Sequence, residues 1–213
     1  MEYKKIQTGG ISYLYKLEGT DLYYGIDYTS GDLYEAEELY AMGHEIRKSR
    51  VVYVSYPEGI VYEPIKTKDN QYFGTPICDN GYIYSLMVDF REKKILVHRI
   101  TPDMKGIGLE AEIDLSEVDD CYNLMLEKSP VCLCRRGQDR DFQVVWPDKG
   151  AFTIDDTEEL NFRDGDKLLF TKWYEDPYYR EESVVRSYPD GSKLDQFRGD
   201  IKEMPDGQKW ILD

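Results

Sequence analysis

The chain has 213 residues, of which 41% are hydrophobic and 32% charged, and its 42 acidic against 27 basic residues give a formal net charge of −15. Such a field repels phosphate backbones and anionic lipid, so it excludes nucleic acid and membrane surfaces as partners and favours a basic one. The length supports a substantial core and apolar runs recur throughout, so we expect one domain over residues 1–213 rather than a disordered chain.

The first residues predict the compartment. Met1-Glu2-Tyr3-Lys4-Lys5 leads into no apolar stretch of the kind found in secretory signals, and no run approaches the length of a membrane span. We therefore expect a cytoplasmic protein without a membrane segment, whose four cysteines are reduced thiols.

The N-terminal third predicts strands and one helix. Residues 11–15 and 22–28 alternate as strands do. Asp32 with Glu35 forms a capping-box pattern ahead of an apolar stripe at helical spacing, which favours a helix or helical insertion over residues 33–47. A hairpin turn at residues 28–31 is the alternative, and it would add a fifth repeat to the pattern described next.

From residue 50 onward, turns that combine proline with an acidic residue recur at regular spacing. The prolines lie 45, 45 and 42 residues apart, at Pro57, Pro102, Pro147 and Pro189. Proline presets φ in a turn, the acidic side chain bonds the backbone, and a glycine, where present, supplies positive φ. Because an apolar or aromatic run precedes each turn and an extended stretch follows it, each predicts a β-hairpin.

A second set of turns shares this period and precedes further predicted strands. These turns are Asn80-Gly81, Asp119-Asp120, Asp164-Gly165 and Asp206-Gly207. A unit of 40–50 residues with two turns has the size of one propeller blade. The last strand, near the end of the sequence, would suit the closure in which a terminal strand completes the first sheet.

The C-terminal residues carry a family resemblance. Residues 204–212, Met-Pro-Asp-Gly-Gln-Lys-Trp-Ile-Leu, resemble the Ser-Pro-Asp-Gly-Lys signature of Tol-type and WD-like β-propeller repeats. Residues 184–192 are similar to the strand and Asp-Gly-Ser turn that precede it, whereas earlier units match in spacing alone. The resemblance implies an all-β fold, a small β-propeller of four to five blades, and brings no catalytic residues with it. The alternative is an α+β fold with one long antiparallel sheet.

Patterns for metal, cofactor or nucleophile chemistry are weak. His44 and His98 stand 54 residues apart, and the thiols of Cys132-x-Cys134 lie on one face of a predicted strand. We expect Cys121, Cys132 and Cys134 to pack as small buried hydrophobes. With no nucleophile elbow and no phosphate-binding loop, we name no catalytic residue, no metal and no cofactor.

The most distinctive segment is a cluster of aromatic and charged residues at 173–180. Exposed aromatic rings beside charges suit a protein interface or a sugar-stacking surface. The predicted binding residues are Trp173, Tyr174, Tyr178, Tyr179 and Arg180. Under the alternative, Trp173 and one tyrosine belong to the core and the others line a sheet face.

These patterns favour a non-catalytic protein-interaction module on a repeated β scaffold, with a basic protein as partner, as in immunity-type proteins that neutralise a basic toxin. A lectin-like propeller that stacks the same aromatics on sugar rings is the first alternative. A glycoside hydrolase using a carboxylate pair is the second, and here no acid or base can be nominated because acidic residues are abundant. The negative charge is also what solubility alone would require.

Overall fold

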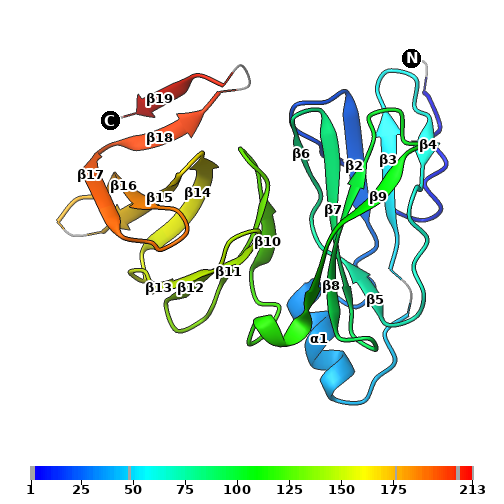
Figure 1. Ribbon diagram of the computed structural model, residues 1–213. Coiled ribbons are helices and arrows are strands. Elements are labelled where there is room, and N and C mark those ends of the chain that lie inside the picture. Colours follow the sequence, from blue (N-terminus) through cyan, green and yellow to red (C-terminus); the bar gives the residue numbers. More distant parts are fainter. Residues whose placement is uncertain (1–2, 48, 176, 205–206, 213) are drawn as a thin grey trace. The chain divides into compact units, whose positions relative to one another are not determined.

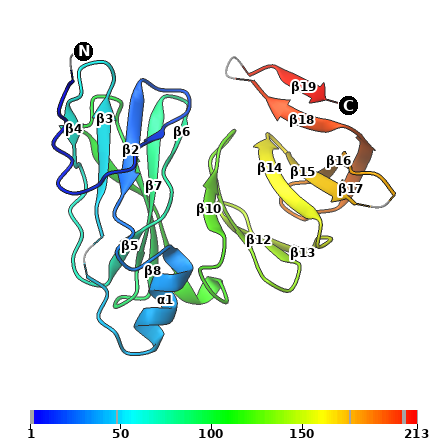
Figure 2. The same ribbon diagram turned by 180° about the vertical axis from the view of Figure 1, so that it is seen from behind.

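The protein is a two-unit, all-β chain. The computed structural model describes residues 3–47, 49–175, 177–204 and 207–212 (Figures 1 and 2). About 49% of the chain is strand and 6% is helix, which confirms the predicted all-β class. The chain divides into an N-terminal unit that ends at Cys121 and a C-terminal unit that starts at Tyr122. Each unit has its own hydrophobic core. The single domain over residues 1–213 stays a prediction.

The predicted alternative of one long antiparallel sheet is wrong. The described strands form five separate sheets with between two and five strands each. The sheets change between β4 and β5, β9 and β10, β13 and β14, and β17 and β18, so each sheet is built from strands that follow one another in the chain.

The first sheet of the N-terminal unit is a four-stranded antiparallel meander. Its strands, in order, are β1 (Tyr15–Lys16), β2 (Leu22–Ile26), β3 (Val51–Ser55) and β4 (Val61–Tyr62). The β-branched and aromatic residues of β3 are almost wholly buried, as expected of a strand with neighbours on both edges.

The predicted helical insertion lies between β2 and β3 as α1 (Leu33–Ala41). The capping box is present, since the Asp32 side chain accepts a hydrogen bond from the Glu35 backbone and the Glu35 side chain accepts one from Asp32. The helix stops before residue 47 because Gly43 takes up a positive φ of 84°, which ends a helix.

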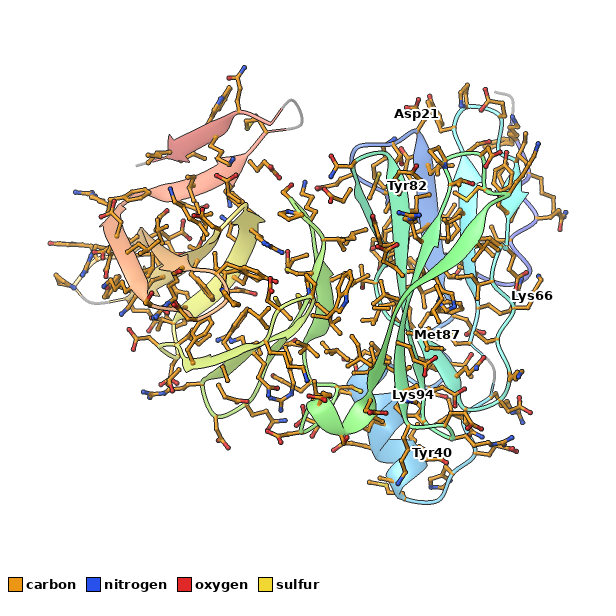
Figure 3. The ribbon with its side chains drawn as sticks, viewed as in Figure 1. Asp21, Tyr40, Lys66, Tyr82, Met87 and Lys94 are labelled. Atoms are coloured by element: carbon orange, nitrogen blue, oxygen red, sulfur yellow. The ribbon has the colours of Figure 1, made fainter. Side chains whose placement is uncertain are left out.

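The second sheet of this unit packs face to face with the first. Its main path is β5–β7–β8–β9, with β6 paired to β7. Its strands are β5 (Gln71–Phe73), β6 (Ile77–Asp79), β7 (Tyr82–Asp89), β8 (Lys94–Ile100) and β9 (Ile107–Asp114), followed by a 3-10 turn, Leu115–Glu117. Val51 and Tyr53 from β3 meet Ile83 and Met87 from β7 in one core. Figure 3 labels Met87.

The C-terminal unit stacks three further antiparallel sheets in chain order. The first is β10 (Leu124–Glu127), β11 (Cys132–Arg136), β12 (Asp141–Trp146) and β13 (Gly150–Thr153). The second is β14 (Glu158–Asp164), β15 (Lys167–Tyr174), β16 (Arg180–Ser187) and β17 (Lys193–Arg198). The third is the hairpin β18 (Asp200–Glu203) and β19 (Lys209–Leu212).

Each predicted proline turn joins the third and fourth strands along the main path of its sheet. These junctions are β3–β4, β8–β9, β12–β13 and β16–β17. Two of the turns contain the same kind of backbone hydrogen bond. Gly59 N donates to Ser55 O over 2.7 Å, and Gly191 N donates to Ser187 O over 2.9 Å. The same local sequence, Ser-Tyr-Pro-acidic-Gly, thus builds the same turn in both units.

The second set of predicted turns is only partly found. Asn80-Gly81 joins β6 to β7 and Asp164-Gly165 joins β14 to β15. Asp119 lies in a bend, and the strand predicted after Asp119-Asp120 is present as β10, although it starts only at Leu124. This pair does not join two strands of a hairpin, and the first hairpin of the third sheet turns at Ser129, with φ 70°. Part of the Asp206-Gly207 turn falls outside the described residues.

The expected closure by the terminal strand is not found. In the described part of the chain β19 pairs only with β18, and the first sheet contains only β1 to β4. All four residues of β19 are exposed, so its outer edge is open.

Candidate functional site

All five predicted binding residues lie at one end of the β15–β16 hairpin. Trp173 and Tyr174 close β15, Arg180 opens β16, and Tyr178 and Tyr179 belong to the connecting loop. The eight-pair register between these strands places Trp173 opposite Glu181 and Tyr174 opposite Arg180. The sequence prediction therefore names residues that the fold does bring together, on a two-stranded support built from long, well-paired strands.

Tyr174 and Arg180 hold each other on one face of the sheet. The guanidinium carbon of Arg180 lies 4.0 Å from the centre of the Tyr174 ring, a cation–π contact. The Tyr174 hydroxyl donates to Glu182 Oε2 over 3.3 Å and accepts from Gln196 Nε2 of β17 over 3.2 Å. Hydrogen bonds from Gln196 and then from Arg180 lower the pKa of the Glu182 carboxyl. These two residues are thus engaged within the sheet and brace the hairpin end.

Trp173, Tyr178 and Tyr179 present aromatic surface to solvent. Their exposed fractions are 37%, 82% and 67%. The Tyr179 hydroxyl donates to Glu181 Oε1 over 2.5 Å, and this bond raises the pKa of Tyr179. Because side chains alternate along a strand, Trp173 and Glu181 lie on the face opposite to Tyr174 and Arg180.

The electrostatic surroundings of these rings are acidic. Glu175 in the loop is exposed, and Glu181 and Glu182 follow on β16. Both cations near the hairpin end are paired with carboxylates, Lys172 with Asp155 and Arg180 with Glu182. Aromatic rings beside carboxylates can receive a cationic side chain, or a sugar ring whose hydroxyls bond the carboxylates.

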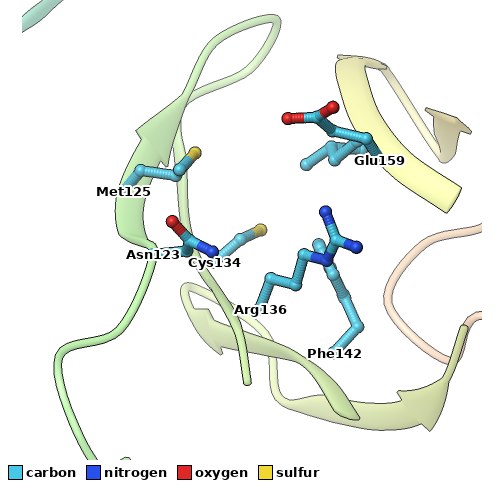
Figure 4. A pocket seen from close by; sticks show the side chains of 7 residues that line it. Asn123, Met125, Cys134, Arg136, Phe142 and Glu159 are labelled. Carbon is cyan, nitrogen blue, oxygen red and sulfur yellow. The ribbon is translucent and has the colours of Figure 1, made fainter. Parts of the chain in front are cut away.

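A small hollow lies beneath this sheet, between β10–β11 and β14. Figure 4 shows Met125 and Cys134 on one side and Glu159 on the other. Its volume is about 60 Å³, which is room for a few waters but not for a drug-sized ligand. We assign it no function. Its lining residues are Asn123, Met125, Cys134, Arg136, Phe142, Glu159 and Leu160.

A larger pocket in the N-terminal unit was missed by sequence reasoning. It measures about 370 Å³, and three half- to largely exposed tyrosines, Tyr13, Tyr15 and Tyr28, line it. The spacing of Tyr13 and Tyr15 by two residues was a usable signal, because it predicts two rings on one face. Nothing local connected these rings to Tyr28, which lies beyond the β1–β2 hairpin.

The cysteines behave as buried apolar groups. Cys121, Cys132 and Cys134 form no disulfide and are at most 1% exposed, so they are buried as predicted. The Cys132 and Cys134 sulfurs lie 3.8 Å apart, and their hydrogen bond, together with burial, raises the pKa of the Cys134 thiol. Within the described residues, no group of three or more histidine, cysteine and acidic side chains has the geometry to hold a metal ion.

Comparison with known proteins gives no family for this chain. No protein-family model matches the sequence, and no curated protein is significantly similar to it. No helix in the described part of the chain combines the length and apolar character needed to cross a membrane.

Proposed function

We propose that this chain is a non-catalytic protein-interaction module that binds a basic segment of another protein through the end of the β15–β16 hairpin. The observation that carries the proposal is the exposure of Tyr178 and Tyr179, at 82% and 67%, on an acidic hairpin end. Large aromatic side chains that stay exposed in the free protein lose water on binding and supply much of the energy of protein interfaces.

The strand ends that carry the loop are braced, which suits the hairpin to binding. The Arg180–Tyr174 contact at 4.0 Å and the hydrogen bond from Gln196 to the Tyr174 hydroxyl at 3.2 Å fix the strand ends on either side of the loop. A preformed binding surface loses less conformational entropy on association than a mobile one. Glu175 and Glu181 then supply negative charge that complements a basic partner.

We also infer that the four meanders are repeats of one propeller-type unit. The placement of all four proline turns between third and fourth strands supports this, as does the shared Ser-Tyr-Pro-acidic-Gly turn at residues 55–59 and 187–191. An experimental structure of the chain in complex with its partner tests the ring arrangement. Sheets that do not follow one another around a common axis would contradict it.

Affinity capture tests the binding site. Immobilised protein is incubated with lysate of its native cells at low and high salt, and retained proteins are identified by mass spectrometry. We expect a basic protein to be retained by the wild type, and Tyr178→Ala/Tyr179→Ala to retain roughly tenfold less of it.

The matched control is Tyr3→Ala/Met42→Ala, which removes two side chains that are 86% and 72% exposed elsewhere on the chain. Equal loss in the control, or no loss in the hairpin variant, would contradict the proposed site. If no protein is retained and a glycan array gives signals that depend on Trp173, the surface is a lectin site instead.

A further inference from the structure

The pocket lined by Tyr13, Tyr15 and Tyr28, here called the tyrosine pocket, is formed by a close approach of two backbones. Residues 9–13 run along β2 and make one wall, and residues 26–29, from the last residue of β2 onward, make the other. This approach requires Gly25: a Cβ there would stand 2.6 Å from Ile11 Cγ2 and 2.8 Å from the carbonyl oxygen of Tyr13. Such distances are too short for non-bonded contacts of a carbon atom. Residues 9–13 can therefore pack against β2 only because residue 25 has no side chain.

Both walls are held in place. The Tyr72 hydroxyl donates to Gly31 O over 2.7 Å and accepts from Ser30 N over 3.2 Å, which fixes the segment that follows Tyr28. On the other side, Arg50 Nη1 donates to Gly9 O over 2.9 Å. The charge of Arg50 is neutralised by Glu63, which accepts from it at 3.0 and 3.1 Å. The pocket is therefore preformed, and Arg50, the cation that holds its wall, is already paired with Glu63.

The rings of the tyrosine pocket have unused capacity for a cation. Elsewhere in this unit the chain covers tyrosine rings with its own charges: Lys16 lies 5.1 Å from the ring of the half-buried Tyr23, and Arg99 lies 4.9 Å from the ring of the exposed Tyr82. Among the described residues no lysine or arginine lies over Tyr13, Tyr15 or Tyr28, although their exposed fractions are 76%, 49% and 47%.

Asp27 supplies the matching negative charge at the pocket wall. Its Oδ1 accepts hydrogen bonds from the backbone and the hydroxyl of Thr29, the former over 3.1 Å, so the carboxylate is oriented. Its Oδ2 accepts no hydrogen bond from the described residues, and Asp27 forms no ion pair there. A carboxylate fixed through one oxygen leaves the other free for an external donor.

We propose that the tyrosine pocket receives an arginine side chain from a basic protein. Guanidinium is flat and weakly hydrated, so it stacks on tyrosine and bonds a carboxylate at the same time, which ammonium does less well. A volume of about 370 Å³ holds the guanidinium with part of its aliphatic stem. The inference rests on the proposed function for the identity of the partner, and it adds a second contact surface on the N-terminal unit.

The direct test uses N-acetyl-arginine amide as probe and its citrulline analogue, which has the same shape without the charge. Backbone ¹H–¹⁵N spectra of the full chain are recorded during titration. We expect saturable shifts at Ser12, Tyr13, Tyr28 and Thr29, with a dissociation constant on the order of millimolar for so small a ligand, and much smaller shifts with citrulline. Equal responses to the two probes, or shifts centred elsewhere, would overturn the proposal.

Two variant pairs separate the contributions. Asp27→Asn keeps the acceptor for Thr29 but removes the charge, and we expect roughly tenfold weaker binding. Tyr15→Phe keeps the aromatic face and should bind nearly as well, whereas Tyr15→Leu should lose roughly threefold. Unchanged affinity in Asp27→Asn would refute the role of the carboxylate.

Tyr178→Ala/Tyr179→Ala should bind the arginine probe like the wild type, because its substitutions lie in the other unit. A failure of the hairpin proposal would therefore leave this titration unaffected. A failure of the titration would leave the hairpin proposal untouched.

Discussion

Gly25 is the residue on which the tyrosine pocket depends. The methyl group of Gly25→Ala would meet the Tyr13 carbonyl at 2.8 Å, and backbone cannot rotate away as a side chain can. We expect the variant to release residues 9–14 from β2, to increase protease cleavage in that segment, and to abolish binding of the arginine probe. Limited proteolysis with mass spectrometry measures the cleavage.

Gly108→Ala is the matched control for Gly25→Ala. A Cβ at Gly108 meets nothing within 4 Å and its φ lies outside the left-handed region, so this substitution should leave cleavage unchanged. If Gly25→Ala were as resistant to protease as Gly108→Ala and still bound the probe, the account of the pocket wall would be wrong.

Glu127 links the stability of the C-terminal unit to pH. Burial of its carboxyl, with a smaller contribution from Cys132 across the β10–β11 hairpin, raises its pKa to about 8. The folded state therefore keeps this proton up to about pH 8, whereas the unfolded state releases it near the ordinary pKa of 4.5. Between these values the unfolded chain binds fewer protons, so the free energy of unfolding falls as pH rises and levels off above the folded pKa.

Glu127→Gln removes this titration. We expect its stability to vary less with pH than that of the wild type, with a gain of roughly 1–3 kcal/mol at mildly alkaline pH. The three tryptophans, Trp146, Trp173 and Trp210, all belong to the C-terminal unit, so tryptophan fluorescence during denaturation reports on that unit. Glu58→Gln, in an exposed turn, is the control, and identical pH profiles for both variants would contradict the assignment.

At the scale of elements, the proline turn after β16 packs tightly on the neighbouring sheet. A Cβ on Gly150, the first residue of β13, would lie 2.0 Å from the carbonyl oxygen of Pro189, and one on Gly191 would lie 2.0 Å from Cγ of Phe152. The turn thus joins two strands of its own sheet and also sets the spacing to the sheet before it. The local sequence therefore forms the turn at the place where it also packs against β13.

Gly150→Ala tests this packing. Because the clash is with backbone, we expect a loss of roughly 2–4 kcal/mol in the free energy of unfolding, measured by tryptophan fluorescence in denaturant. The exposed neighbour provides the control, since Ala151→Ser changes β13 without approaching Pro189. A loss below about 1 kcal/mol for Gly150→Ala would mean that the two sheets can separate without cost.

The elements that sequence predicted correctly are those set by local chemistry. The capping box at Asp32 and Glu35 marks the start of α1, and proline with its acidic neighbour marks the third hairpin of each meander. Asp119-Asp120 precedes β10 without joining a hairpin, because an acidic pair without glycine supplies no positive φ, and Ser129 takes that conformation in the β10–β11 turn.

The sequence predicted which residues form the candidate site, but not which of them brace the hairpin and which are exposed for binding. The grouping of aromatic residues at 173–180 identified the hairpin end, and period-two alternation would have placed Trp173 and Tyr174 on opposite faces. The bracing of Tyr174 depends on Gln196 of β17, 22 residues away, and the tyrosine pocket depends on Gly25 meeting Tyr13. Contacts of that kind arise from tertiary packing, which local sequence patterns do not predict.

At the scale of the whole molecule, negative charge is spread over both units. The N-terminal unit has 22 acidic against 13 basic residues and the C-terminal unit has 20 against 14. No single patch accounts for the net charge of −15, so attraction of a basic partner acts at long range and on the whole chain. Exposed aromatics act only at contact. The two contributions should therefore appear in different rate constants.

Binding kinetics with the captured partner separate these contributions. Raising the salt concentration should slow association by roughly tenfold and change dissociation little, because screening weakens long-range steering more than the packed interface. Tyr178→Ala/Tyr179→Ala should instead speed dissociation and leave association and its salt dependence almost unchanged, because the net charge is the same and only contact surface is lost. Surface plasmon resonance at several salt concentrations gives both rate constants. If the double variant slowed association and left dissociation unchanged, the aromatic hairpin end would not be the contact surface. If salt acted on dissociation alone, the net charge would not steer a basic partner.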